Sequence, residues 1–260
     1  MAVDTPATIA VIGAGPIGLE AALYARFLGY DAQVIEQGRV AEQLLRWGDI
    51  RFETPWKLNA SPLGLAALRA QDTAWVPPAD EDLLTAAELA AVYYLPLAAT
   101  DLLVDRVRVE TEVTAIQRPP LAPGEVLEED DVQGFKLLLH SAAGAQEIEA
   151  DIVIDASGLL IHDTEKARTE DKDRLAFDFD RLLHKGLKLG AASGESVMGD
   201  PRDPRRLLTA EPDFYILGSK SGGAGWGFPI IEGLRQIRDL FTIIGDRPTL
   251  DLYDSPATWK

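Results

Sequence analysis

Residues 8–36 read TIAVIGAGPIGLEAALYARFLGYDAQVIE, and this stretch decides the fold. Thr8–Ile12 is a short apolar run that stops at glycine, which is typical of a strand buried on both faces of a parallel sheet. Pro16–Leu28 carries apolar residues at helical spacing, and Gly29 follows where a C-terminal cap is expected. Residues 31–36 return to strand character. The stretch therefore predicts a β-α-β unit.

The turn between the first strand and the helix reads Gly13-Ala14-Gly15-Pro16-Ile17-Gly18. In this pattern the first glycine makes the tight turn, the second lets a diphosphate approach the backbone, and the third lets helix and strand pack closely. Glu36 lies about 20 residues beyond the glycines, where a carboxylate accepts hydrogen bonds from ribose hydroxyls. Because this acid would repel a 2′-phosphate, the pattern favours FAD or NAD over NADP at this site.

Further elements follow along the chain. A short helix is expected over 41–45, and Thr85 with Glu88 is a capping-box start for a helix ending near Pro96. Strand patterns cover 102–117, 135–140, 148–155 and 214–217, and a helix is expected over 175–189. Pro229 opens an amphipathic helix that runs to about Ile244. A proline- and acid-rich turn is expected over 118–131.

Composition limits the function classes. The 260 residues carry a formal charge of −17, which disfavours nucleic acid and anionic membrane surfaces as partners. The absence of cysteine removes disulfides, thiolate nucleophiles and cysteine metal sites. His140, His162 and His184 are too far apart to suggest a ligand cluster, so no metal site is predicted. No leader or membrane span is expected, and the default is a cytoplasmic enzyme.

Three later segments carry a resemblance to a family. They are IEADIVIDASG over 148–158, DFYILGSKSGGAGWG over 213–227, and the closing helix from Pro229. With the glycine turn, they resemble the FAD-binding domain of flavoproteins with two dinucleotide-binding domains, the group that includes thioredoxin reductases and flavin-containing monooxygenases. The resemblance implies FAD as the cofactor, and three electron donors stay open: NAD(P)H docking transiently, a redox partner, or the substrate.

The implied fold class is α/β: a Rossmann-like three-layer FAD/NAD(P)-binding fold with a central parallel sheet and a small antiparallel β element. It would be a single FAD-binding domain over 1–260, with 1–117, 146–158 and 210–246 forming the nucleotide-binding core and 159–209 a connector or reduced insert. The expected cofactor-binding residues are Gly13, Gly15, Pro16, Ile17, Gly18, Glu36, Gln37, Gln43, Trp56, Val113, Ala156, Ser157, Gly158, Gly218, Ser219 and Lys220. No catalytic residue is predicted. For Trp56, core packing is an equally good interpretation.

The sequence departs from the family in two ways. The family inserts a nicotinamide-binding unit before its last strand, whereas the segment here is short and its cluster Gly190-Ala191-Ala192-Ser193-Gly194 has the wrong spacing. Ser219 also replaces the Asp with which the family contacts the flavin's ribityl and phosphate portion.

The leading hypothesis is an FAD-dependent oxidoreductase acting on a small organic substrate by hydride or two-electron transfer. Two alternatives stay open: an NAD-dependent dehydrogenase, or a non-catalytic FAD-binding module that lost its nicotinamide domain. A homodimer or a redox partner is also left open.

Overall fold

The computed structural model describes residues 6–118, 133–158, 204–209, 211–221 and 228–254. Their strands form a five-stranded sheet in the order β3-β2-β1-β7-β8, in which every pairing is parallel. A second sheet has three antiparallel strands in the order β4-β5-β6. The predicted fold class, a central parallel sheet with a small antiparallel element, is confirmed.

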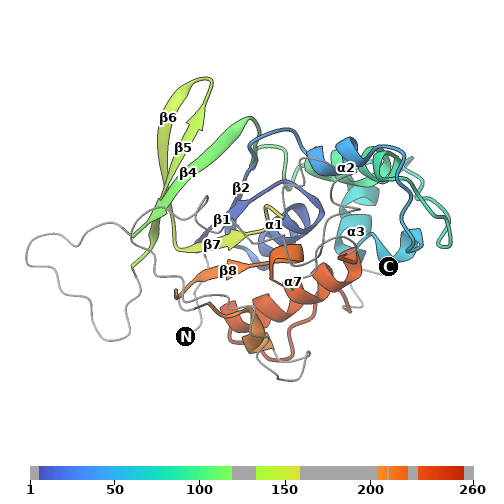
Figure 1. The fold of residues 1–260 in the computed structure, drawn as a ribbon. Coiled ribbons are helices and arrows are strands. Elements are labelled where there is room, and N and C mark those ends of the chain that lie inside the picture. The colour runs from blue at the N-terminus through green and yellow to red at the C-terminus, as the bar shows by residue number, and fades with distance from the viewer. Residues whose placement is uncertain (1–5, 119–132, 159–203, 210, 222–227, 255–260) are drawn as a thin grey trace, which may run out of the picture.

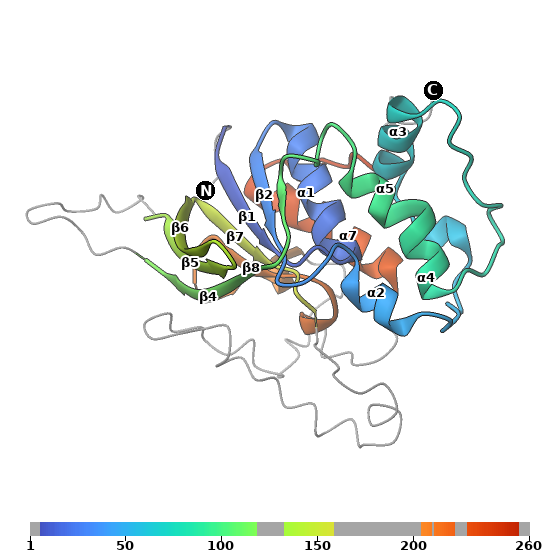
Figure 2. The same cartoon turned by 90° about the horizontal axis from the view of Figure 1, so that it is seen from above.

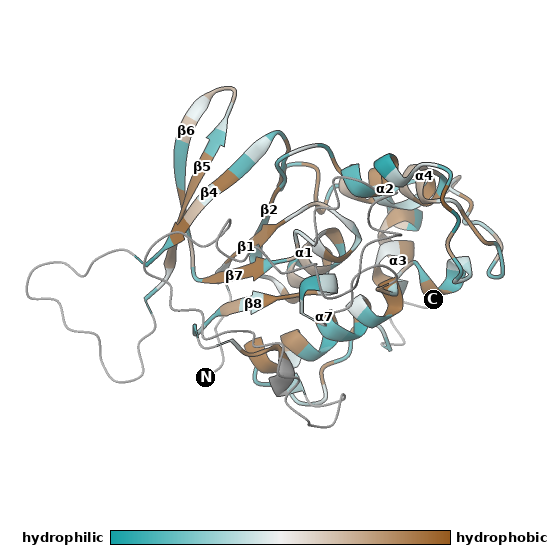
Figure 3. Ribbon diagram, viewed as in Figure 1, coloured by the Kyte–Doolittle hydropathy of each residue, from teal (hydrophilic) through white to brown (hydrophobic). Residues whose placement is uncertain are grey.

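The molecule has three layers, with helices α1 (Pro16–Leu28) and α7 (Ile230–Ile244) on one face of the parallel sheet and the antiparallel sheet on the other (Figures 1 and 2). Alternate residues of β1 (Thr8–Ile12) serve the two interfaces: Ile9 and Val11 pack toward the helices, and Ala10 and Ile12 pack toward the antiparallel sheet. Apolar residues accordingly run along the central strands (Figure 3). This double burial explains why the strand sequence is continuously apolar.

The β-α-β unit forms as the sequence predicts. β2 spans Asp31–Ile35 and pairs with β1 in parallel from Thr8 opposite Asp31 to Ile12 opposite Ile35. Helix α1 ends at Gly29, whose φ of 92° is the left-handed conformation that glycine adopts at C-caps. The remaining strands of the parallel sheet are β3 (Val107–Arg108), β7 (Ile152–Asp155) and β8 (Phe214–Ile216).

The predicted single strand over 148–155 was wrong, because two strands of different sheets share it. β6 (Gly144–Ala150) pairs with β5 (Phe135–Ser141), whereas β7 joins β1. Between them, the Asp151 carboxylate accepts hydrogen bonds from the Thr8 backbone amide at 2.7 Å and from its hydroxyl at 2.8 Å. Asp151 thereby ties the crossing chain to the start of β1. The one or two strands expected over 102–117 are two, β3 and β4 (Thr111–Gln117).

The helix predicted from Thr85 to near Pro96 is confirmed: it has its capping box, and the helical run ends at Ala98. Helix α4 (Ala86–Leu89) passes into a π-helical stretch, Ala90–Tyr94, and then into α5 (Leu95–Ala98). Pro96 is tolerated because it lies in the first turn of α5, where no intrahelical N–H donor is required.

Helix α2 spans Glu42–Trp47, one residue later than expected at its start. Helix α3 (Pro62–Gln71) was not predicted, although Ser61 caps it by accepting the Gly64 amide hydrogen bond at 2.9 Å. One-turn helices occupy Trp56–Leu58, Pro204–Leu207 and Gly218–Lys220. The expected helix over 175–189, the turn over 118–131 except for Arg118, and most of the connector over 159–209 lie outside the described residues.

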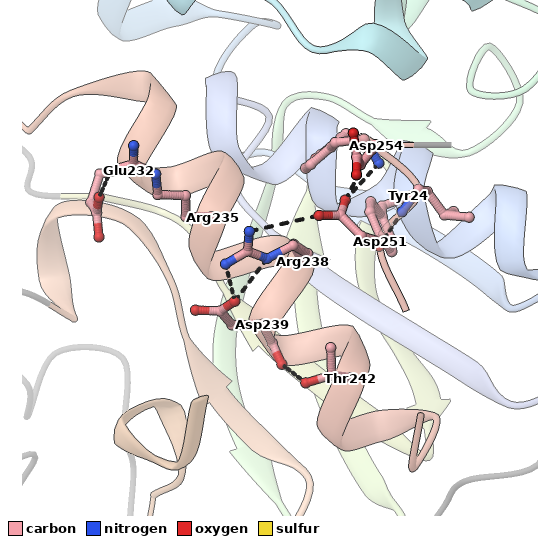
Figure 4. A network of polar contacts seen from close by, with 10 residues as sticks. Tyr24, Glu232, Arg235, Arg238, Asp239, Thr242, Asp251 and Asp254 are labelled. Carbon is pink, nitrogen blue, oxygen red and sulfur yellow. Dashed lines mark hydrogen bonds and ion pairs between the residues drawn. The ribbon is translucent and has the colours of Figure 1, made fainter. Parts of the chain in front are cut away.

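The segment after α7 packs back on α1 and α7. The Tyr24 ring stacks on Phe241 at 5.0 Å between ring centroids and meets Tyr253 edge-on at 5.1 Å. Arg238 bonds Asp239 at 2.7 Å and reaches Asp251 at 3.7 Å (Figure 4). These contacts fasten residues beyond the last helix to the first helix of the fold.

Tyr24→Phe is expected to lower the free energy of unfolding by about 1 to 2 kcal/mol, because the Tyr24 hydroxyl accepts the Leu252 amide hydrogen bond at 3.0 Å and the variant leaves that donor unpaired. Urea unfolding measures the loss. Tyr253→Phe is the matched control: among the described residues its buried hydroxyl has no hydrogen-bond partner, so its removal should cost little. Equal losses in the two variants would contradict the assignment.

Candidate functional site

The parallel sheet has a topological switch point between its neighbouring strands β1 and β7. The chain builds outward from β1 to β2 and β3 on one side, and then places β7 and β8 on the other. In open parallel sheets, ligands bind beyond the carboxyl ends of the strands at such a switch point. Here Gly13 follows β1 directly, and Ala156 follows β7. The topology thus brings two of the predicted cofactor-binding segments to one place.

The glycine turn has the conformation that its residues predict. Gly13 has a φ of 102°, and a Cβ there would lie 2.7 Å from the Ser157 Cα. A Cβ on Gly18 would lie 1.9 Å from the Gly13 carbonyl oxygen. A Cβ on Gly15, in contrast, would meet nothing within 4 Å. The backbone at Gly13 and Gly18 is therefore packed tightly against neighbouring protein atoms. The space beside Gly15 is open, and this is the position where a diphosphate would approach.

The open turn lies at the N-terminus of α1, where backbone amides and the helix dipole favour an anion. Pro16 is the first residue of the helix and has no N–H, so Ile17 and Gly18 supply the next amides. No acidic residue occupies the first turn of α1. These features fit a diphosphate group.

Glu36 holds the turn from the second strand. Its carboxylate accepts hydrogen bonds from the Ala14 amide at 2.8 Å and from the Gly38 amide at 2.7 Å. A carboxylate has about four lone-pair sites, so these two bonds leave capacity for ribose hydroxyls. The Glu36 backbone also pairs with Arg108 and Thr111, which places the acid at the edge where β2, β3 and β4 meet.

The residues after β7 and β8 form a polar cluster, which we call the Asp155–Ser157–Lys220 cluster. Lys220 Nζ donates to Asp155 Oδ2 at 3.0 Å and to Ser157 Oγ at 2.6 Å. Ser157 donates to Asp155 Oδ1 from its hydroxyl at 2.7 Å and from its amide at 3.0 Å. The Lys220 and Asp155 side chains are only 12% and 7% exposed. The cluster joins two segments that are more than 60 residues apart in sequence.

The turn after β8 is also tied to the two helices. Gly218 has a φ of 78°, and its amide donates to Gln236 Oε1 of α7 at 2.8 Å. A Cβ on Gly218 or on Gly233 would meet the Ile17 side chain of α1. Ser219 lies beside Gly158, its hydroxyl 3.8 Å from where a Gly158 Cβ would be. The predicted residues after β1, β7 and β8 therefore form one contiguous site.

For the remaining predicted residues, the described part of the structure gives no contact with this cluster. Trp56 is buried in the helix-side core and meets Tyr93 edge-on at 5.4 Å, so core packing accounts for it. Val113 is buried between the two sheets. Gln37 is exposed, and among the described residues the buried Gln43 Nε2 has no hydrogen-bond partner. Cofactor contacts by these residues stay predictions.

A second polar group, which the sequence analysis missed, lies inside the protein. Glu20 of α1 is fully buried, and its Oε1 accepts a hydrogen bond from the Tyr93 hydroxyl at 2.5 Å. The Tyr93 hydroxyl in turn accepts the Ser61 amide hydrogen bond at 3.0 Å. Burial raises the pKa of Glu20 to about 7, against the lowering effect of its bonds to Ser61 and Tyr93. Among the described residues Glu20 Oε2 has no partner.

Asp155 was also missing from the predicted site, although it lies at its centre. It had the signal of an acid at the end of a predicted strand, but its partner Lys220 becomes visible only when β7 and β8 pair. Within the described part of the chain, no group of three or more His, Asp or Glu residues could hold a metal ion. No helix there is long and apolar enough to cross a bilayer.

No protein-family model matches the chain, and no curated protein does. Among solved structures, bacillithiol disulfide reductase Bdr from Bacillus cereus is similar at 19% identity over 58% of this chain and 40% of its own, with a TM-score of 0.42. OTEMO in complex with FAD and NADP is similar at 21% identity over 60% of this chain and 26% of its own, with a TM-score of 0.41.

S-allyl-L-cysteine S-oxygenase from Allium sativum is similar at 16% identity over 58% of this chain and 36% of its own, with a TM-score of 0.43. The chain thus spans two fifths or less of the length of these three structures.

Proposed function

We propose that this protein is an FAD-dependent oxidoreductase that acts on a small organic substrate by hydride or two-electron transfer. The observation that carries the proposal is the convergence at the switch point of the glycine turn, Glu36 and the turns after β7 and β8. A simple NAD-binding unit requires only the first two of these features.

The chain's own residues would act as binding groups. The open side of the turn at Gly15 and the amides at the start of α1 would hold the diphosphate, and Glu36 would accept hydrogen bonds from the adenosine ribose. When bound, FAD supplies the redox chemistry, because its ring accepts and donates hydride or electrons. The reducing equivalents would come from NAD(P)H docking transiently, from a redox partner or from the substrate.

The test is the absorption spectrum of the purified chain, with calorimetric titrations of FAD, NAD⁺ and NADP⁺. We expect a flavin spectrum, or reconstitution by added FAD, and weaker binding of NADP⁺ than of NAD⁺ because Glu36 repels a 2′-phosphate. Anaerobic addition of NADH or NADPH then shows whether nicotinamide reduces the flavin. A colourless chain that cannot take up FAD would defeat the proposal, and tight FAD binding without any turnover would select the non-catalytic module.

A further inference from the structure

The candidate site contains two carboxylates beside the place where a doubly charged diphosphate would bind. Glu36 bonds the Ala14 amide within the turn itself. Asp155 ends β7 directly opposite Ile12, the last residue of β1 before Gly13. Two anions so near an anion site oppose its occupation, because like charges in a partly buried site repel strongly. Some feature of the site has to offset them.

Lys220 is the cation that contacts Asp155. Its Nζ lies 3.0 Å and 3.3 Å from the two Asp155 carboxylate oxygens, and both side chains are largely buried. Solvent and salt screen a buried pair much less than a surface pair, so they weaken the attraction between Lys220 and Asp155 only a little. Lys220 therefore cancels the charge of the acid that lies next to the turn.

The same ammonium also fixes the backbone that faces Gly13. It donates to Ser157 Oγ, and Ser157 donates to Asp155 from both hydroxyl and amide. The Ser157 Cα is the backbone atom nearest to where a Gly13 Cβ would be, at 2.7 Å. The Asp155–Ser157–Lys220 cluster thus forms one wall of the glycine turn.

We propose that Lys220 is a positioning residue for a dinucleotide: it neutralises Asp155 and holds Ser157 against the glycine turn, so that the site accepts a diphosphate. This inference rests on the proposed function and deepens it, because it gives Lys220, which the sequence suggested as a cofactor-binding residue, an indirect role. Lys220 acts through Asp155 and Ser157 rather than as a direct ligand. It follows that the ammonium becomes dispensable once the carboxylate is gone.

The experiment compares FAD affinity in the full-length chain and in Lys220→Met, Asp155→Asn and the double variant, by calorimetry or flavin fluorescence. We expect Lys220→Met to weaken FAD binding about tenfold or more, and the double variant to recover to within about threefold of the unsubstituted chain. Lys136→Met is the matched control, because it removes one charge from the Lys136–Glu147 pair of the antiparallel sheet and should leave FAD affinity unchanged.

Competition of ADP and of adenosine against bound FAD distinguishes an electrostatic role of Lys220 from a merely structural one. Lys220→Met should lower the affinity for ADP, which carries a diphosphate, and leave the affinity for adenosine unchanged. Equal losses for ADP and adenosine would mean a merely structural role and would overturn the inference. A double variant as weak as Lys220→Met would show that neutralising Asp155 does not explain the effect of Lys220, and would overturn the inference too.

If Lys220→Met does not fold, the double variant decides alone: recovery of FAD binding upholds the inference, and weak binding refutes it. Unaltered affinity in a folded Lys220→Met also refutes it. If the unsubstituted chain does not bind FAD at all, that different result would refute the proposed function itself.

Discussion

Gly18→Ala is expected to abolish dinucleotide binding and to lower the free energy of unfolding by about 3 kcal/mol. The reason is that the new methyl carbon would lie 1.9 Å from the Gly13 carbonyl oxygen, a backbone atom that cannot turn aside as a side chain could. Either the helix separates from the strand or the turn opens, and both changes disrupt the site. Thermal or urea unfolding and a titration with FAD measure the two effects.

Gly15→Ala is the matched control in the same turn. Gly15 has a φ of −79°, which alanine adopts without strain, and its Cβ would meet no protein atom within 4 Å. We expect stability within about 0.5 kcal/mol of the unsubstituted chain but FAD affinity at least about tenfold lower, since the methyl group enters the space left for the diphosphate. If Gly15→Ala binds FAD as tightly as the unsubstituted chain, the diphosphate does not bind beside Gly15.

The second large effect is expected at Glu20. Its pKa is about 7 in the folded protein and 4.5 in the unfolded chain, so the folded state retains a proton that the unfolded state releases. The stabilising contribution of protonated Glu20 to the free energy of unfolding is therefore fully present below pH 4.5. It decreases as the pH rises toward 7 and is lost above that pH. The difference amounts to about 3 kcal/mol.

Glu20→Gln should accordingly unfold less readily than the unsubstituted chain at pH 8, by up to about 3 kcal/mol, and match it near pH 4.5. The amide keeps an oxygen for the Tyr93 hydroxyl and carries no charge. Urea unfolding over pH 4.5 to 8 provides the measurement. Tyr93→Phe is the comparison, because it removes a hydrogen bond that lowers the pKa of Glu20 and should deepen the pH dependence. A Glu20→Gln variant with an unchanged pH slope would contradict this account.

Much of the parallel sheet could be predicted from the sequence, because its signals are local. The apolar run of β1, the helical spacing of α1 and the left-handed Gly29 depend on residues close together in the chain. The same holds for β8 and for the start of α7 at Pro229. The glycine turn was identified for the same reason, since its spacing alone encodes a tight strand-to-helix connection.

Other features were missed because their causes are not local. The strand expected over 148–155 divides at Asp151, whose partner is Thr8, and no periodicity marks that division. The helical run from Thr85 includes a π-helical stretch, Ala90–Tyr94, before α5, and no sequence periodicity indicates that change of helix type. Trp56 was assigned to the cofactor as readily as to the core, because its ring contact with Tyr93 joins two segments that are distant in sequence.

By itself, then, the sequence determined the β-α-β unit, the glycine turn and the acid Glu36, because strand, helix and turn preferences depend on near neighbours. Only the tertiary structure placed Asp155, Ser157 and Lys220 beside that turn and buried Glu20 against Tyr93. The physical reason is that charge neutralisation and desolvation depend on distance in space, and the residues that carry them are brought together by strand pairing and helix packing.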